Sequence, residues 1–173
     1  MKLFQNYHNM AEFVLAQESD AGLISRLGHK IFDETYKDIL SEEQIEYMLE
    51  MMYSTFSILR QMQNNNTFYI VYCEGEPCGY IAIERKGENL FHLQKLYLRS
   101  DMHGQNIGRE MMNKVYSHAK ELSPDGATIT LNVNRENPTL NFYKKMGWEI
   151  IDEGDFELGC GFFANDYIMK FEV

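Results

Sequence analysis

The sequence predicts one domain of the mixed α/β (α+β) class over residues 1–173, with helices on both faces of a mostly antiparallel sheet. Apolar residues recur at helical spacing in some segments and at alternate positions in others. Short turns separate three strand-like segments between residues 67 and 99, which favours antiparallel pairing. A strand, a long helix and a second strand follow between residues 90 and 133, and this order predicts a parallel pair with a right-handed crossover.

One strand and two helices are predicted in the first third of the chain. The strand lies near residues 12–17, and the apolar spacing predicts a helix over residues 20–36. A second helix begins at Ser41, which forms a capping box with Gln44, and runs to residue 63, where three asparagines end it. The apolar face of this second helix contains Ile45, Leu49, Met52, Phe56 and Leu59.

Three strands and a long helix are predicted in the middle of the chain. The strands cover residues 67–74, 78–85 and 90–99, which are rich in aromatic and β-branched side chains. The helix covers residues 104–122 and is amphipathic. One of its faces carries Ile107, Met111, Val115, Ala119 and Leu122.

The C-terminal part is predicted to add three strands and a short helix. Residues 127–133 alternate between apolar and polar side chains, as a half-buried strand does. A short helix over residues 138–146 begins near a proline and is ended by Gly147. Residues 148–153 and 162–172 then form the closing pair of strands.

The composition argues against several classes of function. The chain has 16 Lys and Arg and 26 Asp and Glu, and its net charge of −10 disfavours a nucleic-acid-binding surface. No segment has the roughly 18 apolar residues that a membrane span needs, and the N-terminus lacks the pattern of a signal peptide. Three cysteines without metal-like spacing indicate neither a disulfide framework nor a metal site. We therefore expect a cytoplasmic protein with no nucleic-acid or membrane partner.

Residues 96–109 form the first candidate functional site. They lie where a strand ends and the long helix begins, so main-chain N–H groups converge there and the helix dipole presents its positive end. Small residues let an anion approach the main chain, and Arg109 adds a positive charge. These features suit a pyrophosphate, although a strand-to-helix turn that uses glycine for geometry alone explains them too. The dinucleotide-binding and P-loop patterns are absent.

Residues 103–108 read His-Gly-Gln-Asn-Ile-Gly and resemble the cofactor loop of the GNAT superfamily of N-acetyltransferases, Gln/Arg-x-x-Gly-x-Gly/Ala. The segment departs from that pattern at two positions. His103 replaces Gln or Arg and can still donate a hydrogen bond. Asn106 replaces the first glycine, and Asn is the non-glycine residue that best tolerates positive φ.

A second block strengthens the resemblance. Residues 137–148 read Asn-Pro-Thr-Leu-Asn-Phe-Tyr-Lys-Lys-Met-Gly-Trp and look like the superfamily segment Asn-x-Ala-Ile-x-Phe-Tyr-x-x-x-Gly-Phe. Taken alone, this block is also typical of a surface helix that an aromatic side chain attaches to a sheet. The two blocks occur in the order and at the separation that the superfamily requires. Residues 158–169 also look like the last hairpin of a bacterial branch that acts on small molecules such as polyamines.

The resemblance implies a GNAT-like fold in which the parallel central strands splay apart and the pantetheine arm of acetyl-coenzyme A (acetyl-CoA) enters the gap as a pseudo-strand. The main chain of residues 96–98 would pair with the arm, residues 103–109 would hold the pyrophosphate, and no metal is expected. Asn137 would bond to the arm, and Lys145 would meet the nucleotide phosphates. The residues that the resemblance assigns to acetyl-CoA are Leu96, Tyr97, Leu98, His103, Gly104, Gln105, Asn106, Ile107, Gly108, Arg109, Asn137, Tyr143 and Lys145.

The implied reaction is that of an acyl-CoA-dependent N-acyltransferase, in which a neutral amine attacks the thioester directly within a ternary complex. The departing thiolate benefits from a proton donor, for which Tyr143 is the candidate. His92 is the candidate base, because some superfamily members carry Glu or His on the central strand. Strand alternation places residues 92, 94, 96 and 98 on one face. Glu84 and ordered water are the alternatives, and a structural role for His92 also remains open.

The expected partners are acetyl-CoA and a small cationic amine. Acidic residues are concentrated in the segments that usually select the acceptor in this superfamily, although a solvated acidic surface also explains them. The alternatives are acetylation of a protein or peptide amine, a non-catalytic acyl-CoA-binding module and an interaction protein without a cofactor. A homodimer is left open. The acidic residues are Asp33, Glu34, Asp38, Glu42, Glu43, Asp152, Glu153, Asp155 and Glu157.

Overall fold

The structure is a computed structural model that describes residues 11–173, and its centre is one seven-stranded sheet. The strands follow the order β1-β2-β3-β4-β5-β7-β6, and β4 and β5 are the parallel pair, whereas the other neighbours are antiparallel. The predicted mixed α/β class is thereby confirmed. The elements are β1 (Glu12–Leu15), α1 (Ala21–Tyr36), α2 (Glu42–Tyr53), α3 (Thr55–Gln63), β2 (Asn66–Cys73), β3 (Glu76–Arg85), β4 (Leu90–Leu98), α4 (Ile107–Leu122), β5 (Thr128–Asn134), α5 (Thr139–Lys145), β6 (Glu149–Gly159) and β7 (Phe162–Glu172).

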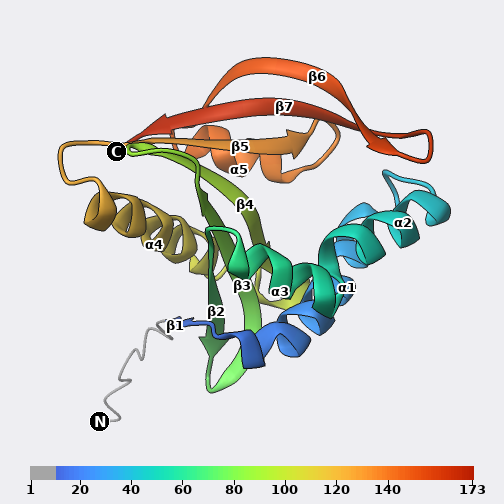
Figure 1. The fold of residues 1–173 in the computed structure, drawn as a ribbon, viewed down its shortest axis with the longest axis horizontal. Coiled ribbons are helices and arrows are strands. Elements are labelled where there is room, and N and C mark those ends of the chain that lie inside the picture. Colours follow the sequence, from blue (N-terminus) through green and yellow to red (C-terminus); the bar gives the residue numbers. More distant parts are fainter. Residues whose placement is uncertain (1–10) are drawn as a thin grey trace, which may run out of the picture.

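Helices cover both faces of the sheet, as predicted. The helices α1, α2 and α3 pack on one face, where Ile24, Phe32 and Ile58 are buried together with Tyr80 of β3. The long helix α4 and the short helix α5 pack on the other face, and the apolar positions predicted for α4 from residue 107 to residue 119 are buried there. Figure 1 shows that β2–β4 and β5–β7 run in different directions, so the sheet opens between its two halves.

The parallel pairing between β4 and β5 is short. Partners are formed from Leu90 with Thr128 to Leu93 with Leu131, and residues 94–98 of β4 have no partner on β5. The first half of each strand therefore holds the sheet together. The second halves separate, which leaves one side of the β4 main chain without a neighbouring strand.

A β-bulge lies at the point where the two strands separate. Ala82 of β3 pairs with Lys95 and Ile83 pairs with Leu93, so Gln94 is an extra residue on β4. Leu96 packs on the α4 side, and the side chain of Lys95 reaches the α1–α3 side. The prediction that residues 92, 94, 96 and 98 share one face was wrong, because the bulge reverses the alternation.

The helix predicted over residues 41–63 is two helices. Ser54 lies between them with a ψ of 150°, and its hydroxyl accepts a hydrogen bond from the N–H of Ser57, so it caps α3. The hydroxyl of Ser25 donates to the main-chain oxygen of Tyr53, which completes the end of α2. The apolar spacing continues across the break, but α3 takes a new direction and leaves Phe56 68% exposed.

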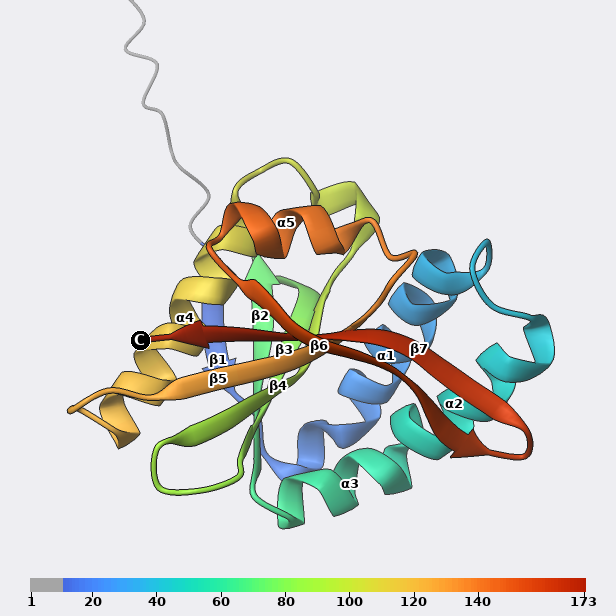
Figure 2. The same ribbon diagram turned by 90° about the horizontal axis from the view of Figure 1, so that it is seen from above.

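Boundaries elsewhere differ from the predictions by a few residues, apart from β6, which extends to Gly159. The β6–β7 hairpin reaches over α2 (Figure 2), where the Tyr47 hydroxyl donates to the main-chain oxygen of Leu158 at 2.7 Å. The amide of Gln44 donates to the main-chain oxygen of Phe163 at 2.8 Å. The hairpin, which belongs to the β5–β7 half of the sheet, is thus attached to α2, which packs on the β2–β4 half.

The close approach of β3 and β4 can be tested at Gly79 of β3, which lies beside the part of β4 that has no β5 partner. A Cβ at this position would lie 2.3 Å from the main-chain oxygen of Tyr97, so Gly79→Ala must displace β4. We expect a loss of about 1–3 kcal/mol in the free energy of unfolding, measured by urea denaturation.

Gly22→Ala in α1 is the matched control. Its added Cβ meets nothing closer than 3.6 Å, at the end of the flexible Arg26 side chain. Because alanine favours a helix more than glycine does, this variant should gain up to about 1 kcal/mol. Equal effects of the two substitutions would contradict the close approach at Gly79.

Candidate active site

A cavity of about 600 Å³ occupies the opening between β4 and β5. It is bounded by α1 on one side and by the start of α4 and by α5 on the other, so both faces of the sheet contribute to it. The lining residues are Ile31, Thr35, Tyr36, Leu93, Gln94, Lys95, Leu96, Tyr97, Leu98, His103, Gly104, Asn106, Gly108, Arg109, Met111, Leu131, Asn132, Val133, Asn137, Pro138, Thr139, Phe142 and Tyr143.

One end of the cavity is the N-terminus of α4. Gly104 and Asn106 have φ values of +78° and +67°, and this left-handed backbone turns the chain into the helix. Within the part of the chain that the structure describes, no acceptor takes up the main-chain N–H groups of residues 104–108. Free N–H groups at a helix N-terminus bind anions. This end of the cavity therefore suits a phosphate group.

Two basic side chains lie beside these N–H groups. Arg109 is exposed at the start of α4 and has no ion-pair partner among residues 11–173. The Nε2 atom of His103 lies 3.0 Å from the main-chain oxygen of Leu98. Arg99, by contrast, is paired with Asp101. Arg109 is thus the guanidinium available to a bound phosphate.

The open side of β4 forms the wall of the cavity. Leu96, Tyr97 and Leu98 pair with β3 on one side and lack a β5 partner on the other. An unpaired strand edge recognises an extended ligand through main-chain hydrogen bonds. The edge leads from the α4 N-terminus toward the bulge at Gln94, so an extended ligand with an anionic end could use both.

Tyr143 of α5 lines the cavity opposite this edge. It is only 7% exposed, and its ring packs near the rings of Phe142 and Trp148, with centroid separations of 5.6 and 6.0 Å. Among the described residues no hydrogen-bond partner is assigned to its hydroxyl. Burial raises the pKa of Tyr143, so the hydroxyl keeps its proton at neutral pH and is a potential proton donor.

Four other residues predicted to bind the cofactor take less direct positions. Asn137 lines the cavity, but its Nδ2 donates to the Tyr36 hydroxyl at 3.1 Å and its Oδ1 accepts from the N–H of Thr139. Ile107 is buried in the core, and the amide of Gln105 donates to the main-chain oxygen of Asp101. Lys145 is exposed in the last turn of α5. Neither Gln105, Ile107 nor Lys145 lines the cavity.

His92, the candidate base, lies outside the cavity. It sits where β4 and β5 are still paired, and its Nδ1 is 2.8 Å from the hydroxyl of Thr130. Burial lowers the pKa of His92 to about 4, and the nearby Lys86 and Lys95 charges act in the same direction. The imidazole is therefore neutral at pH 7. The alternative base, Glu84, accepts a hydrogen bond from Gln94 and lies 3.6 Å from Lys86.

Lys95 is a cavity residue that the sequence analysis missed. It is 6% exposed and its Nζ donates to Oε1 of Gln61. Its signal in the sequence was a lysine between Leu93 and Leu96 in an otherwise buried strand. Strand periodicity alone could not show that the bulge turns this side chain to the α1–α3 side of the sheet.

Within residues 11–173, no group of three or more His, Cys, Asp or Glu side chains could hold a metal ion. None of the helices in these residues is long and apolar enough to cross a membrane. Cys73 and Cys78 are buried, and Cys160 is exposed.

The chain is similar to known acetyltransferases in sequence pattern and in fold. A family model described as an acetyltransferase (GNAT) domain matches residues 36–164, which is most of the chain. The chain is similar in fold to the PaiA N-acetyltransferase of Thermoplasma acidophilum, solved in complex with coenzyme A, with a TM-score of 0.79, 21% identity, and coverage of 94% of this chain and 99% of that one. The fold is also similar to that of Ard1 of Thermoplasma volcanium, with a TM-score of 0.71, 15% identity, and coverage of 94% of this chain and 97% of that one. For YjaB of Escherichia coli the TM-score is 0.67 and the identity 19%, with coverage of 94% of this chain and 97% of that one.

The left-handed backbone at Asn106 can be tested by two substitutions. Asn106→Ala should lower the free energy of unfolding by about 1 kcal/mol, because alanine tolerates positive φ less well than asparagine. Asn106→Gly removes the steric conflict and should leave stability within about 0.5 kcal/mol of the wild type. Urea denaturation compares the three proteins, and an alanine variant as stable as the glycine variant would argue against this backbone conformation.

The buried, neutral state of His92 predicts a pH dependence of stability. Its folded-state pKa of about 4 lies below the ordinary 6.5, so its contribution is fully present above pH 6.5 and is lost as the pH falls toward 4. The loss reaches about 3 kcal/mol once the pH is below both values. His92→Gln lacks this titration, so the stability gap between wild type and variant should narrow on acidification in urea denaturation. A gap that stays constant from pH 7 to pH 4 would refute the assignment.

Proposed function

Since the chain belongs to the GNAT family of acetyltransferases, we propose that it transfers the acetyl group of acetyl-CoA to a primary amine by direct attack in a ternary complex. The observation that carries the proposal is the cavity between the separated ends of β4 and β5, which joins an anion-binding helix terminus to an open strand edge. A long ligand with a diphosphate at one end and a thioester at the other matches this arrangement.

The proposed cofactor site uses both features. The free N–H groups of residues 104–108, together with Arg109, would hold the pyrophosphate. The pantetheine arm would lie along Leu96, Tyr97 and Leu98. Asn137 would contribute by fixing the start of α5 and Tyr36 beside the arm. Lys145, which is exposed at the end of α5, would meet the nucleotide end from outside the cavity.

The chemistry requires an amine without its extra proton and a stable leaving thiol. As the amine attacks the thioester carbonyl, the C–S bond breaks, and Tyr143 would donate its proton to the departing sulfur. Its buried, protonated hydroxyl supports this role. His92 does not line the cavity, so we propose that the proton of the amine leaves through ordered water rather than directly to His92. Holding the two reactants in one cavity would supply much of the remaining acceleration.

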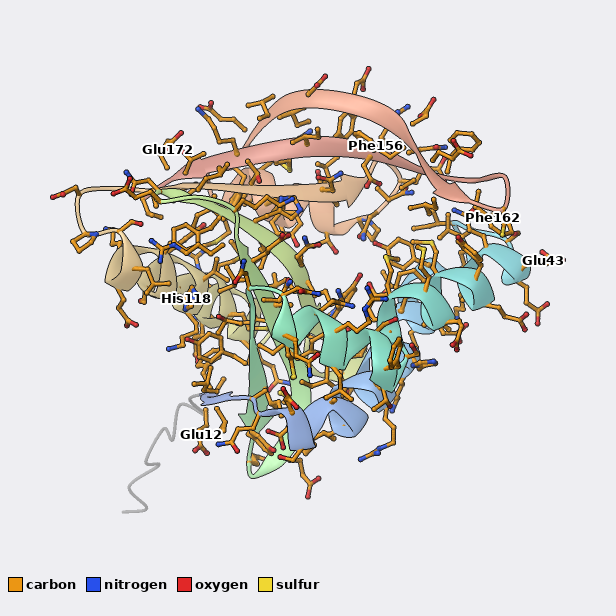
Figure 3. All side chains as sticks on the ribbon, in the orientation of Figure 1. Glu12, Glu43, His118, Phe156, Phe162 and Glu172 are labelled. Atoms are coloured by element: carbon orange, nitrogen blue, oxygen red, sulfur yellow. The ribbon has the colours of Figure 1, made fainter. Side chains whose placement is uncertain are left out.

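The acceptor is proposed to be a small cationic amine. Figure 3 shows that Glu43 of α2 and Phe162 of β7 lie at the same end of the molecule, where the hairpin meets α2. The rings of Tyr47 and Phe162 pack there with a centroid separation of 5.4 Å. Acidic residues of α1, α2 and β6 would attract a cation to this end, and the attached hairpin favours a small acceptor over a protein. A non-catalytic acyl-CoA-binding module is disfavoured by Tyr143, because pure binding needs no proton donor.

The reaction is tested by following thiol release from acetyl-CoA with a panel of amines. We expect release that requires both substrates. Tyr143→Phe should lower kcat about 100-fold, because a positioned general acid contributes 10²–10⁴-fold, while KM for acetyl-CoA changes less than about threefold.

The matched control is Tyr72→Phe, at a tyrosine that does not line the cavity, and it should retain wild-type kcat. Tight binding of acetyl-CoA by calorimetry without thiol release for any amine would support the binding module instead. Equal rates for Tyr143→Phe and the wild type would remove Tyr143 from the mechanism.

A further inference from the structure

Lys95 lines the cavity, and its ammonium group is buried on the α1–α3 side of the sheet. Its side chain is 6% exposed, and it projects from the bulge of β4 toward α3. Nζ donates a hydrogen bond to Oε1 of Gln61 and lies 5.3 Å from the centre of the Tyr53 ring. Lysine is almost never this buried unless an opposite charge pairs with it.

No carboxylate of the described residues pairs with this ammonium. Glu84 acts on Lys95 only through its field, since its own carboxylate accepts from Gln94 and pairs with Lys86. Gln61 is held in place by a 2.9 Å bond from its Nε2 to the main-chain oxygen of Met52. The ammonium group of Lys95 has three hydrogens. The amide oxygen of Gln61 accepts one of them, and the face of the Tyr53 ring lies near another. The third has no assigned acceptor in residues 11–173.

The charge of Lys95 persists at neutral pH. Burial lowers its pKa to about 8, and Glu84 opposes this shift. Most of the molecules are therefore still protonated at pH 7. A protonated, buried lysine without a counter-ion costs stability, and such a cost is retained where a ligand supplies the missing anion.

Lys95 and Arg109 are the lysine and the arginine that line the cavity within residues 11–173, and they lie on opposite faces of the sheet. Arg109 belongs to the start of α4, beside the N–H groups proposed for the pyrophosphate. Lys95 reaches the α1–α3 side, whereas Leu96 and Leu98 pack on the α4 side. No Asp or Glu is among the described residues that line the cavity. Arg109 thus lies at the end of the cavity proposed for the cofactor's phosphates, and Lys95 lies on the opposite, α1–α3 side of the sheet.

We propose that Lys95 binds a carboxylate on the acceptor, so that the substrate is an amine that also carries a carboxylate, as an amino acid does. This inference rests on the proposed acetyl transfer and narrows its small amine acceptor. The acidic residues outside the cavity would draw in the amine, and the cation inside would orient the molecule by its carboxylate. A polyamine, which has no anionic group, would leave Lys95 unpaired and add a second buried cation beside it.

The test compares acceptors in matched pairs, each amine offered with a free carboxylate and as the corresponding carboxamide. Thiol release gives kcat/KM for wild type, Lys95→Met and Lys120→Met, the last being an exposed lysine of α4. Wild type and Lys120→Met should prefer the carboxylate about 10- to 100-fold, the range that a hydrogen bond to a charged group provides. Lys95→Met should lose this preference because the rate for the carboxylate falls. Its rate for the carboxamide should fall less than its rate for the carboxylate, because the carboxamide carries no negative charge for Lys95 to bind.

Other outcomes would overturn either the assignment of Lys95 or the proposed function. Equal rates for carboxylate and carboxamide in the wild type, or an undiminished preference in Lys95→Met, would overturn the assignment of Lys95. Absence of thiol release with every amine would instead refute the proposed function. Folding is checked by thermal unfolding, in which Lys95→Met should melt at or above the wild-type temperature, because an unpaired buried charge is replaced by an apolar chain. The wild-type preference tests the inference even without a folded variant.

Discussion

The early end of the β4–β5 pairing is the constraint on which the rest of the site depends. Past Leu93 and Leu131 the two strands have no hydrogen bonds to each other, and the main chain of β4 keeps one unpaired edge inside the molecule. Buried main-chain groups are normally paired, so such an edge indicates a place for a ligand. The bulge at Gln94 lies at the same point and turns Lys95 to the α1–α3 side. The α4 N-terminus stands at the other end of the edge and adds unpaired N–H groups.

The charge of the protein is divided between its surface and this cavity. The chain has a net charge of −10, yet among the described residues the cavity is lined by Lys95 and Arg109 and by no Asp or Glu. An acidic exterior would favour the approach of a cationic amine, and a basic interior would retain the anionic parts of the ligands. The tyrosines of the cavity are buried and protonated, which suits donation of hydrogen bonds or protons rather than binding of cations.

Local patterns in the sequence sufficed for most of the fold and for one end of the site. The positive φ at Asn106, the position of the α4 N-terminus and the burial of alternate residues in β5 follow from residue type and spacing, so they could be predicted. The helix break at Ser54 could not, because the apolar spacing continues through it and a contact with Ser25, far away in sequence, stabilises it. The bulge at Gln94 adds one residue to one strand, and periodicity counted along a single strand cannot detect it. Lys95 was overlooked for this reason, whereas His92 lies outside the cavity because β4 is still paired with β5 at that residue.

A crystal structure of the protein with acetyl-CoA bound would show whether the opening between β4 and β5 holds the cofactor. We expect the pyrophosphate within hydrogen-bonding distance of main-chain N–H groups in residues 104–108. We also expect the pantetheine arm along the open edge of Leu96–98 and the thioester sulfur beside the Tyr143 hydroxyl. A cofactor bound elsewhere, or strands β4 and β5 closed against each other with the ligand outside, would contradict this expectation.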